Sequence, residues 1–313
     1  MLFRPPPEAA PGSRQGRPAG GAHPADSPHP ADGAPAALPA GPLDVHVEQV
    51  RAGGRRGGRR GPAVLDGVDL YLPAGSRVAL VGPSGAGKST LANLLLRFAD
   101  PWSGRILVGG VDLRELPEEA LRRAVVGLTQ DAHVFDATVR ENLLLARPDA
   151  TDEQLTEVLG RVGLGDWLRS LPRGLGSRVG PDGARLSGGQ RQRLLLARVL
   201  LTDARVIVAD EPTAHLDAAT ERTVMDLLLT LAADRTVLVI THRRAALEHM
   251  DAVYELSADG RVRPTTAAAV RAADPGGDGL DRLPEPPPAA RLLPALTASC
   301  AAPLPSSPEV PRG

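Results

Sequence analysis

A glycine-rich loop between an apolar run and a helical pattern constrains this chain most strongly. The loop fits the pattern G-x-x-x-x-G-K-[ST]. Residues 77–81 before it are typical of a buried strand, and residues 91–98 after it are typical of a helix. A strand, a glycine loop and a helix in this order are the context that a phosphate-binding P-loop requires. The predicted P-loop consists of Gly82, Pro83, Ser84, Gly85, Ala86, Gly87, Lys88, Ser89 and Thr90.

The residue types of this loop suit a bound triphosphate. Glycines allow backbone N–H groups to point inward, and these groups and the helix N-terminus bind phosphate oxygens. Lys88 reaches the β- and γ-phosphates, and the Ser89 hydroxyl is placed for Mg²⁺. Lys88 is the only lysine of the 313 residues, at a position where a compact ammonium fits and a planar guanidinium does not.

The rest of the chain is expected to form one α/β unit. Residues 1–42 and 264–313 are rich in proline and alanine and are expected to be disordered, which leaves a folded domain at 43–263. Strands are predicted at 43–50, 64–72, 77–81, 104–108, 125–128, 205–209, 236–240 and 252–256. Helices are predicted at 91–98, 117–123, 138–146, 152–161, 189–202 and 217–232, and an arginine-rich hairpin loop at 51–61.

Composition limits the classes of function. Aromatic residues make up only 2% of the chain, so the core must consist of Leu, Val and Ala. A net charge of -1 predicts no partnership with nucleic acid through an overall field. The single cysteine, Cys300, excludes an internal disulfide. No run of about 20 apolar residues and no apolar signal core occur, so an intracellular location is expected.

Polar residues follow three predicted strands, and ligands of open α/β sheets bind at such strand ends. Asp210 can hold Mg²⁺ through water, and Glu211 can polarise an attacking water. His242 can hydrogen-bond the γ-phosphate, and Gln130 can reach the metal and the water. These groups suit in-line phosphoryl transfer to water, in which the protein mainly positions groups and stabilises charge.

Residues 186–193, Leu-Ser-Gly-Gly-Gln-Arg-Gln-Arg, resemble the signature of ABC ATPases, and the resemblance covers roughly 43–263. It implies a P-loop NTPase with a RecA-like core sheet, an antiparallel β subdomain and an α-helical signature subdomain. It also implies ATP and Mg²⁺ as ligands, with Ser89, Gln130 and Asp210 at the metal. Two domains are expected to form a head-to-tail dimer. In that dimer each signature contacts the other subunit's ATP through Ser187, Gly188, Gly189 and Gln190. The D-loop is expected at 214–217 and includes Asp217; Lys88, Glu211 and His242 are the expected catalytic residues.

Two further segments indicate an exporter subtype. Gln130 corresponds to the Q-loop of the family, and residues 134–142 are similar to the segment that follows this loop in exporter domains. Residues 179–183 stand where exporters carry their X-loop. This subtype implies a transmembrane permease as partner, a location at the cytoplasmic face of the membrane and no nucleic acid. The D-loop with His215 and the end of the last core strand are most similar to thiol-exporter subunits linked to cytochrome bd assembly. Lipid, peptide and drug exporters share nearly all of these features.

The sequence departs from the family pattern in three places. No aromatic residue stands near Gly53 and Gly54 to stack on adenine, and Arg55, Arg56, Arg59 and Arg60 are the candidate substitutes. Pro181 replaces the expected X-loop acid. The membrane domain is missing, so either a separate permease is the partner or the chain is a fragment of a fused exporter. A soluble ABC ATPase acting on nucleic acid or ribosomes and a non-hydrolysing ATP-binding module are the alternative functions.

Overall fold

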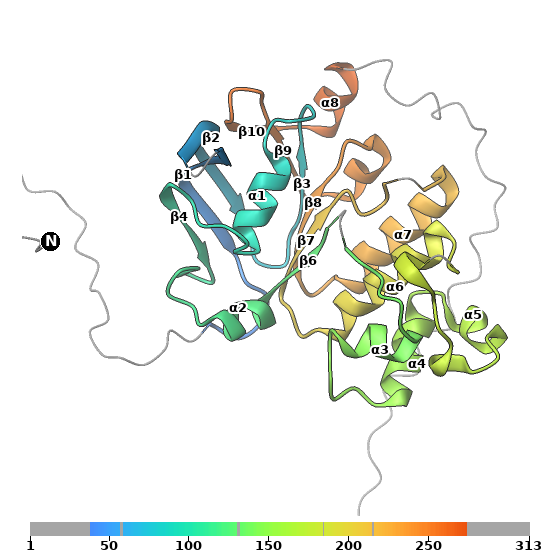
Figure 1. The fold of residues 1–313 in the computed structure, drawn as a ribbon. Coiled ribbons are helices and arrows are strands. Elements are labelled where there is room, and N and C mark those ends of the chain that lie inside the picture. Colours follow the sequence, from blue (N-terminus) through green and yellow to red (C-terminus); the bar gives the residue numbers. More distant parts are fainter. Residues whose placement is uncertain (1–37, 57–58, 130–131, 184, 215, 274–313) are drawn as a thin grey trace, which may run out of the picture. The chain divides into compact units, whose positions relative to one another are not determined.

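Two β-sheets and a helical insertion form the described part of the chain (Figure 1). The structure is a computed structural model and describes residues 38–273 except 57–58, 130–131, 184 and 215. The first sheet is antiparallel, with the order β2 (Arg59–Leu72), β1 (Val45–Arg56), β4 (Ser103–Val108), β5 (Val111–Asp112).

The second sheet positions the P-loop. Its order is β10 (Val262–Thr265), β9 (Ala252–Leu256), β3 (Arg77–Val81), β8 (Thr236–Ile240), β7 (Val206–Asp210), β6 (Val125–Leu128). All neighbours are parallel except β10 with β9. Every residue of β7 and β8 is buried, as in a parallel sheet covered on both faces. The carboxyl ends of β3, β7 and β8 therefore meet at one edge.

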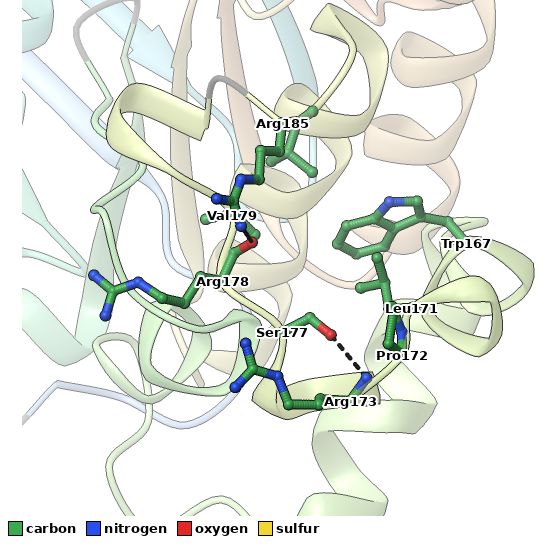
Figure 2. Close-up of a pocket in the computed structure, with 9 residues that line it drawn as sticks. Trp167, Leu171, Pro172, Arg173, Ser177, Arg178, Val179 and Arg185 are labelled. Carbon is green, nitrogen blue, oxygen red and sulfur yellow. Dashed lines mark hydrogen bonds between the residues drawn. The ribbon is translucent and has the colours of Figure 1, made fainter.

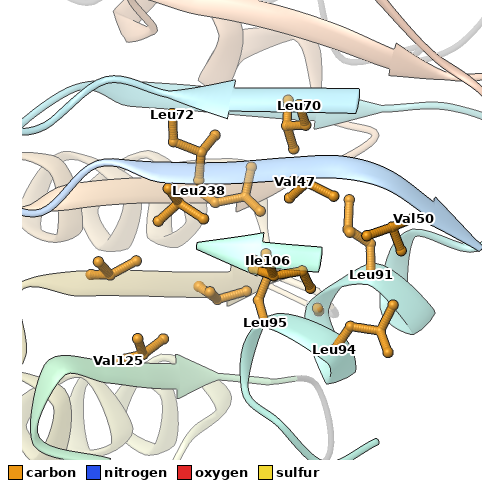
Figure 3. Close-up of a cluster of buried hydrophobic side chains, with 14 of the residues drawn as sticks. Val47, Val50, Leu70, Leu72, Leu91, Leu94, Leu95, Ile106, Val125 and Leu238 are labelled. Carbon is orange, nitrogen blue, oxygen red and sulfur yellow. The ribbon is translucent and has the colours of Figure 1, made fainter. Parts of the chain in front are cut away.

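Helix α1 (Lys88–Leu95) lies between the two sheets. Its apolar face, with Leu91 and Leu95, packs against β1 residues such as Val47 and against Leu238 of β8 in one buried cluster (Figure 3). The buried residues of the cluster are Leu, Val and Ala with two isoleucines, Ile106 and Ile240, and the partly buried Tyr254 packs against it. The prediction of a core built from Leu, Val and Ala therefore holds for most of this cluster and misses the isoleucines.

The segment between β6 and β7 is the helical insertion. It contains α3 (Val139–Leu144), α4 (Asp152–Arg161), α5 (Gly165–Ser170), the 3-10 turns η1 (Gly174–Gly176) and η2 (Pro181–Gly183), and α6 (Gly188–Leu201). A second buried cluster joins these helices to β7, β8 and α7 (Ala218–Leu231). The helices α2 (Glu118–Ala124) and α8 (Ala267–Ala273) and the turn η3 (Arg244–His249) complete the described elements. None of the helices in this part of the chain combines the length and the apolar character needed to cross a membrane.

The structure differs from the sequence prediction at a few elements. The arginine-rich segment expected as a hairpin loop continues β1 and β2, because backbone pairing reaches Arg56 and Arg59 through several register shifts. Helix α5 was not predicted, since six residues are too short to show a helical period. Residues 264–273, expected within the C-terminal tail, form the end of β10 and helix α8. Residues 1–37 and 274–313 lie outside the described residues. The predicted α/β class, with an antiparallel part and a helical part, is confirmed.

Candidate functional site

The P-loop leaves the carboxyl end of β3 and enters α1 through three glycines with positive φ. Gly82, Gly85 and Gly87 have φ values of 146°, 79° and 107°. A Cβ at Gly82 would lie 2.2 Å from the carbonyl oxygen of Leu256, and a Cβ at Gly87 would lie 2.7 Å from Val64 Cγ1. Glycine is therefore required at both positions by backbone conformation and by space. Gly87 is the N-cap of α1 and offers no side-chain acceptor to the N–H groups of the first turn.

Lys88 begins α1 and turns its ammonium back over the loop. Its Nζ donates to the carbonyl oxygens of Gly82 at 2.7 Å and Pro83 at 2.9 Å. Burial lowers the pKa of Lys88, while the charges of Glu211 and Asp210 act in the opposite direction. The two acids from the end of β7 are thus close enough to act on the P-loop lysine.

A polar cleft of about 680 Å³ lies over the P-loop. Nine of the ten residues that line it belong to the predicted site, and the tenth is Val64 of β2, which the sequence analysis missed. The predicted lining residues are Gly82, Ser84, Gly85, Gly87, Lys88, Ser89, Thr90, Glu211 and His242. The remaining members of the predicted P-loop are Pro83, which is exposed, and Ala86, which packs into the core between the sheets.

Two carboxylates at the end of β7 differ in their surroundings and backbone conformation. Asp210 is buried at 7% exposure, as the last residue of the strand. Glu211 follows with φ of 48°, a left-handed conformation that is uncommon for glutamate. Its N–H donates to the carbonyl oxygen of Ile240 at 2.9 Å, which holds this strained residue at the sheet edge. Strain of this kind gathers at sites where the position of one side chain matters.

Glu211 and His242 meet across the cleft. The Nδ1 atom of His242 lies 3.4 Å from Oε1 of Glu211, and both side chains remain accessible to solvent. Loops after two adjacent strands, β7 and β8, bring them together. The arrangement offers a carboxylate and an imidazole to a water molecule or a phosphate in the cleft.

The metal site is only partly described. Asp210 and Ser89 supply a carboxylate and a hydroxyl, which are the hard oxygen donors that Mg²⁺ accepts alongside water. Gln130, the third predicted ligand, lies outside the described residues. Within the described ranges, no group of three or more His, Cys, Asp or Glu side chains could hold a metal ion. The donor set therefore fits a metal that keeps several waters and binds the substrate's phosphates.

The predicted signature forms the N-terminus of α6. Ser187 is the N-cap; its Oγ accepts from the N–H of Gln190 at 3.2 Å, and Gln190 Oε1 accepts from the N–H of Ser187 at 2.9 Å. Ser187 and Gly188 are exposed, and Gly189 is buried, where a Cβ would lie 2.5 Å from Thr220 Cγ2. None of the four signature residues lines the cleft over the chain's own P-loop.

Asp217 caps helix α7, next to the signature. Its Oδ1 accepts from the N–H groups of Ala219 at 3.1 Å and Thr220 at 3.0 Å. The hydrogen bond that Asp217 accepts from the Thr220 hydroxyl has the largest effect on its pKa. Together with the two backbone bonds, it lowers the pKa of Asp217. Asp217 is exposed and held rigidly, whereas His215 of the same loop lies outside the described residues.

The loop after Gln130 is held by buried polar groups that the sequence analysis did not single out. Asn142 is fully buried and bonds both backbone groups of Phe135 at 3.0 Å. Arg198 of α6 donates to the carbonyl oxygens of Asn142 at 2.8 Å and His133 at 2.6 Å. Burial lowers the pKa of Arg198 to about 10. Signals of this kind exist only in the tertiary structure, because the partners are 56 and 65 residues apart.

A second, smaller cavity of about 300 Å³ lies in the helical insertion (Figure 2). Trp167 and Leu171 form one wall, and Val179 and Arg185 lie on the other side. Val179 is the first residue of the predicted X-loop. The residues that line this cavity include none of the predicted catalytic residues, all three of which line the cleft over the P-loop.

Known proteins are similar to this chain in sequence. The family model described as "ABC transporter" matches residues 65–214. An ATP-dependent lipid A-core flippase of Ralstonia nicotianae is 41% identical over 220 residues, which are 67% of this chain and 37% of that protein. A mitochondrial potassium channel ATP-binding subunit of Xenopus tropicalis is 43% identical over 200 residues, 64% of this chain and 29% of that protein. The chain thus spans about a third of the length of these relatives.

A solved structure adds the three-dimensional comparison. The structure of a bacterial Atm1-family ABC exporter with ATP bound matches with a TM-score of 0.69 and 34% identity. The match covers 77% of this chain and 41% of the exporter chain. The family that the sequence motifs predicted is confirmed, whereas the narrower resemblance to thiol-exporter subunits stays a prediction.

Proposed function

This chain carries an ATP-binding domain of the ABC transporter family, of the exporter type, and from that premise we propose that it powers export through a membrane permease. One observation carries the proposal: Lys88, Glu211 and His242 line one polar cleft, while the signature end at Ser187 is exposed and outside that cleft. In this proposal a complete ATP site is shared between two copies. One copy supplies the cleft with the three catalytic residues, and the other supplies the N-terminus of α6, which binds the phosphate.

The proposed roles follow from the chemistry of each group. The N–H groups of the P-loop and Lys88 bind the β- and γ-phosphates of ATP. Ser89, Asp210 and Gln130 would hold Mg²⁺, which would neutralise charge on the phosphate oxygens. Glu211 accepts a proton from the water that attacks the γ-phosphorus, and His242 donates a hydrogen bond to the γ-phosphate. The bond to the β-phosphate oxygen breaks, and ADP and phosphate leave.

The dimer completes the site. In the proposed head-to-tail pair, Ser187, Gly188, Gly189 and Gln190 of one copy face the γ-phosphate bound to the P-loop of the other. Asp217 lies at the same seam. The second copy is either another molecule of this chain or a related domain. A transmembrane permease, separate or part of a longer protein, is the proposed partner at the cytoplasmic face of the membrane, and no nucleic acid is expected.

A Glu211→Gln variant tests the ATPase proposal. We expect hydrolysis to fall by on the order of a hundredfold or more, because the variant removes the base. ATP-dependent dimerisation, measured by light scattering, should be retained. Glu119→Gln, an exposed glutamate on α2, is the matched control and should hydrolyse ATP like the parent chain. Full hydrolysis by Glu211→Gln would contradict the assigned role.

Capture of partners tests the export proposal. The Glu211→Gln variant, loaded with Mg-ATP, would be used as bait in detergent-solubilised membranes, with the Lys88→Met variant as a control that lacks the bound nucleotide. We expect recovery of a multi-helix membrane protein with the first bait only. Recovery of ribosomes or nucleic acid without a membrane protein would favour a soluble ABC ATPase instead.

A further inference from the structure

The residue after the proposed catalytic histidine forms a buried ion pair. Nη1 of Arg243 lies 2.9 Å from Oε2 of Glu221, and the two side chains are only 20% and 8% exposed. Some other ion pairs of the described residues are far more open, such as Arg123 with Glu119 at 77% for both side chains. A buried ion pair is poor evidence for stability, because desolvation cancels much of the attraction. Its geometric effect is stronger, since either charge left alone in this place would be costly.

The backbone around His242 is anchored on both sides. The N–H of Arg243 donates to Oγ1 of Thr241 at 2.9 Å. Thr241 is 2% exposed, and its own N–H donates to the carbonyl oxygen of Leu80 in β3 at 3.3 Å. The His242 side chain, by contrast, is 55% exposed and makes one long contact, with Glu211. Its position therefore depends on the two neighbours and on what holds them.

Glu221 belongs to the first turn of α7, which is a firm support. Its N–H donates to the carbonyl oxygen of Asp217 at 2.8 Å, and the Asp217 side chain caps the helix. Thr220, in the same turn, packs against Gly189 of the signature helix. A carboxylate at this end of a helix is also favoured by the helix dipole. The ion pair thus fastens the loop of His242 to the rigid junction of α7 and α6.

We propose that Arg243 is a positioning residue that, through Glu221, holds the His242 imidazole beside Glu211. The inference rests on the proposed ATPase function and deepens it. Arg243 does not line the cleft, so it acts on the reaction only through its neighbour. Without the ion pair the loop loses its link to α7, and the imidazole loses the place from which it meets the γ-phosphate. Displacements of about 1 Å at a reacting centre cost on the order of a hundredfold in rate.

The test compares Arg243→Met and Arg243→Lys with the parent chain, and Arg123→Met serves as the matched control from an exposed pair. We expect Arg243→Met to lower kcat by about ten- to a hundredfold, with the KM for ATP changed by less than about threefold, because the P-loop is untouched. Arg243→Lys keeps the charge and should recover part of the loss. Arg123→Met should leave both constants as they are.

A double-mutant cycle separates positioning from plain stability. In a His242→Ala background, Arg243→Met should cause no further loss of kcat, because it acts through the histidine. The proposal would be overturned if the double variant lost kcat by the product of the two single losses. It would also be overturned if Arg243→Met bound ATP normally and kept a kcat within about twofold of the parent chain. If Arg243→Met does not fold, Glu221→Gln takes its place with the same expectations. An unchanged rate for Glu211→Gln would instead contradict the proposed ATPase function, whatever Arg243 does.

Discussion

Two helix N-termini of this chain were predicted to bind phosphate, and the structure builds them in opposite ways. Helix α1 begins after Gly87, which has φ of 107° and gives the first turn no side-chain acceptor. Helix α6 begins after Ser187, which forms a complete capping box with Gln190. The N-terminus of α1 thus offers its backbone N–H groups with no competing side-chain acceptor. At the N-terminus of α6, the capping box already satisfies some of these N–H groups.

The difference indicates a division of labour. Unsatisfied N–H groups at a helix start lower stability until an acceptor arrives, so the α1 end is incomplete without a phosphate. The α6 end is stable by itself, which suits a group that meets a nucleotide only when a second copy approaches. Ser187 Oγ accepts a bond in the capping box and can still donate its hydrogen to a phosphate oxygen. The P-loop should therefore dominate ATP affinity, and the signature should act mainly on hydrolysis.

The strongest test of this comparison is Lys88→Met, which keeps an unbranched side chain one atom shorter than lysine and removes its charge. ATP affinity should fall by about a hundredfold, since charged hydrogen bonds to the phosphates are lost. Titration with a fluorescent ATP analogue measures the effect, and Arg122→Met on the exposed face of α2 is the control. Affinity within about threefold of the parent chain would refute the dominance of the α1 end.

The P-loop could be predicted from the sequence because its glycines, lysine and flanking periods are local signals. The same holds for the buried strands that end at Asp210 and before His242, whose apolar runs show without a partner. The capping box at Ser187 was also visible as an S-x-x-Q spacing, yet the sequence analysis interpreted it only as an anion-binding end. The hydrogen bonds of the structure were needed to show that the same segment also caps its own helix.

Other features could not be predicted because they depend on contacts between distant residues. Arg243 and Glu221 are 22 positions apart in sequence, and nothing local distinguishes them from exposed charges. Val64 enters the cleft only because β2 passes over Gly87. The arginine-rich segment has the composition of a loop, but pairing between β1 and β2 extends the strands into it. Backbone pairing there overrides local propensity.

Ser187→Ala tests the other half of the comparison, and Thr151→Ala is its matched control. Both residues are N-caps in complete capping boxes, on α6 and α4. Each substitution should lower the free energy of unfolding by about 1 kcal/mol. Only Ser187→Ala should slow hydrolysis, by on the order of ten- to a hundredfold, because only that hydroxyl is proposed to face the nucleotide of a second copy.

Chemical denaturation and steady-state ATPase assays measure the two effects separately. ATP affinity of the monomer should be unchanged in both variants. Equal rates for Ser187→Ala and Thr151→Ala would mean that the capping box on α6 has a structural role alone.

Gly189→Ala is expected to act on stability. The added Cβ would lie 2.5 Å from Thr220 Cγ2, so the junction of α6 and α7 must shift at a cost of about 1–3 kcal/mol. Gly160→Ala in the last turn of α4 is the control; nothing lies within 4 Å of its Cβ, and it should stabilise by about 0.5–1 kcal/mol. Thermal and denaturant unfolding give both values.

A second substitution identifies the cause. Thr220→Ser removes the crowding methyl group and keeps the hydroxyl that donates to Asp217. The double variant Gly189→Ala with Thr220→Ser should recover most of the lost stability. Failure to recover it would show that the helix junction is not limited by this contact.

The smallest effect is expected from Gly54→Tyr, which would add an exposed aromatic side chain to β1. The structure already places the Trp102 ring beside Gly53, where a Cβ would lie 2.8 Å from it, although the sequence predicts no aromatic residue there. Nothing lies within 4 Å of a Cβ at Gly54, whereas a Cβ at Gly53 would lie 2.4 Å from the carbonyl oxygen of Pro62. Stacking on adenine should add about 1 kcal/mol of binding, or roughly fivefold in affinity, in Gly54→Tyr but not in Gly53→Tyr. Inorganic tripolyphosphate, which has no base, should bind the parent chain and Gly54→Tyr equally, because the α1 end alone holds it. A gain for tripolyphosphate as large as that for ATP would show that the tyrosine acts on the P-loop, and the separation of base and phosphate binding would fail.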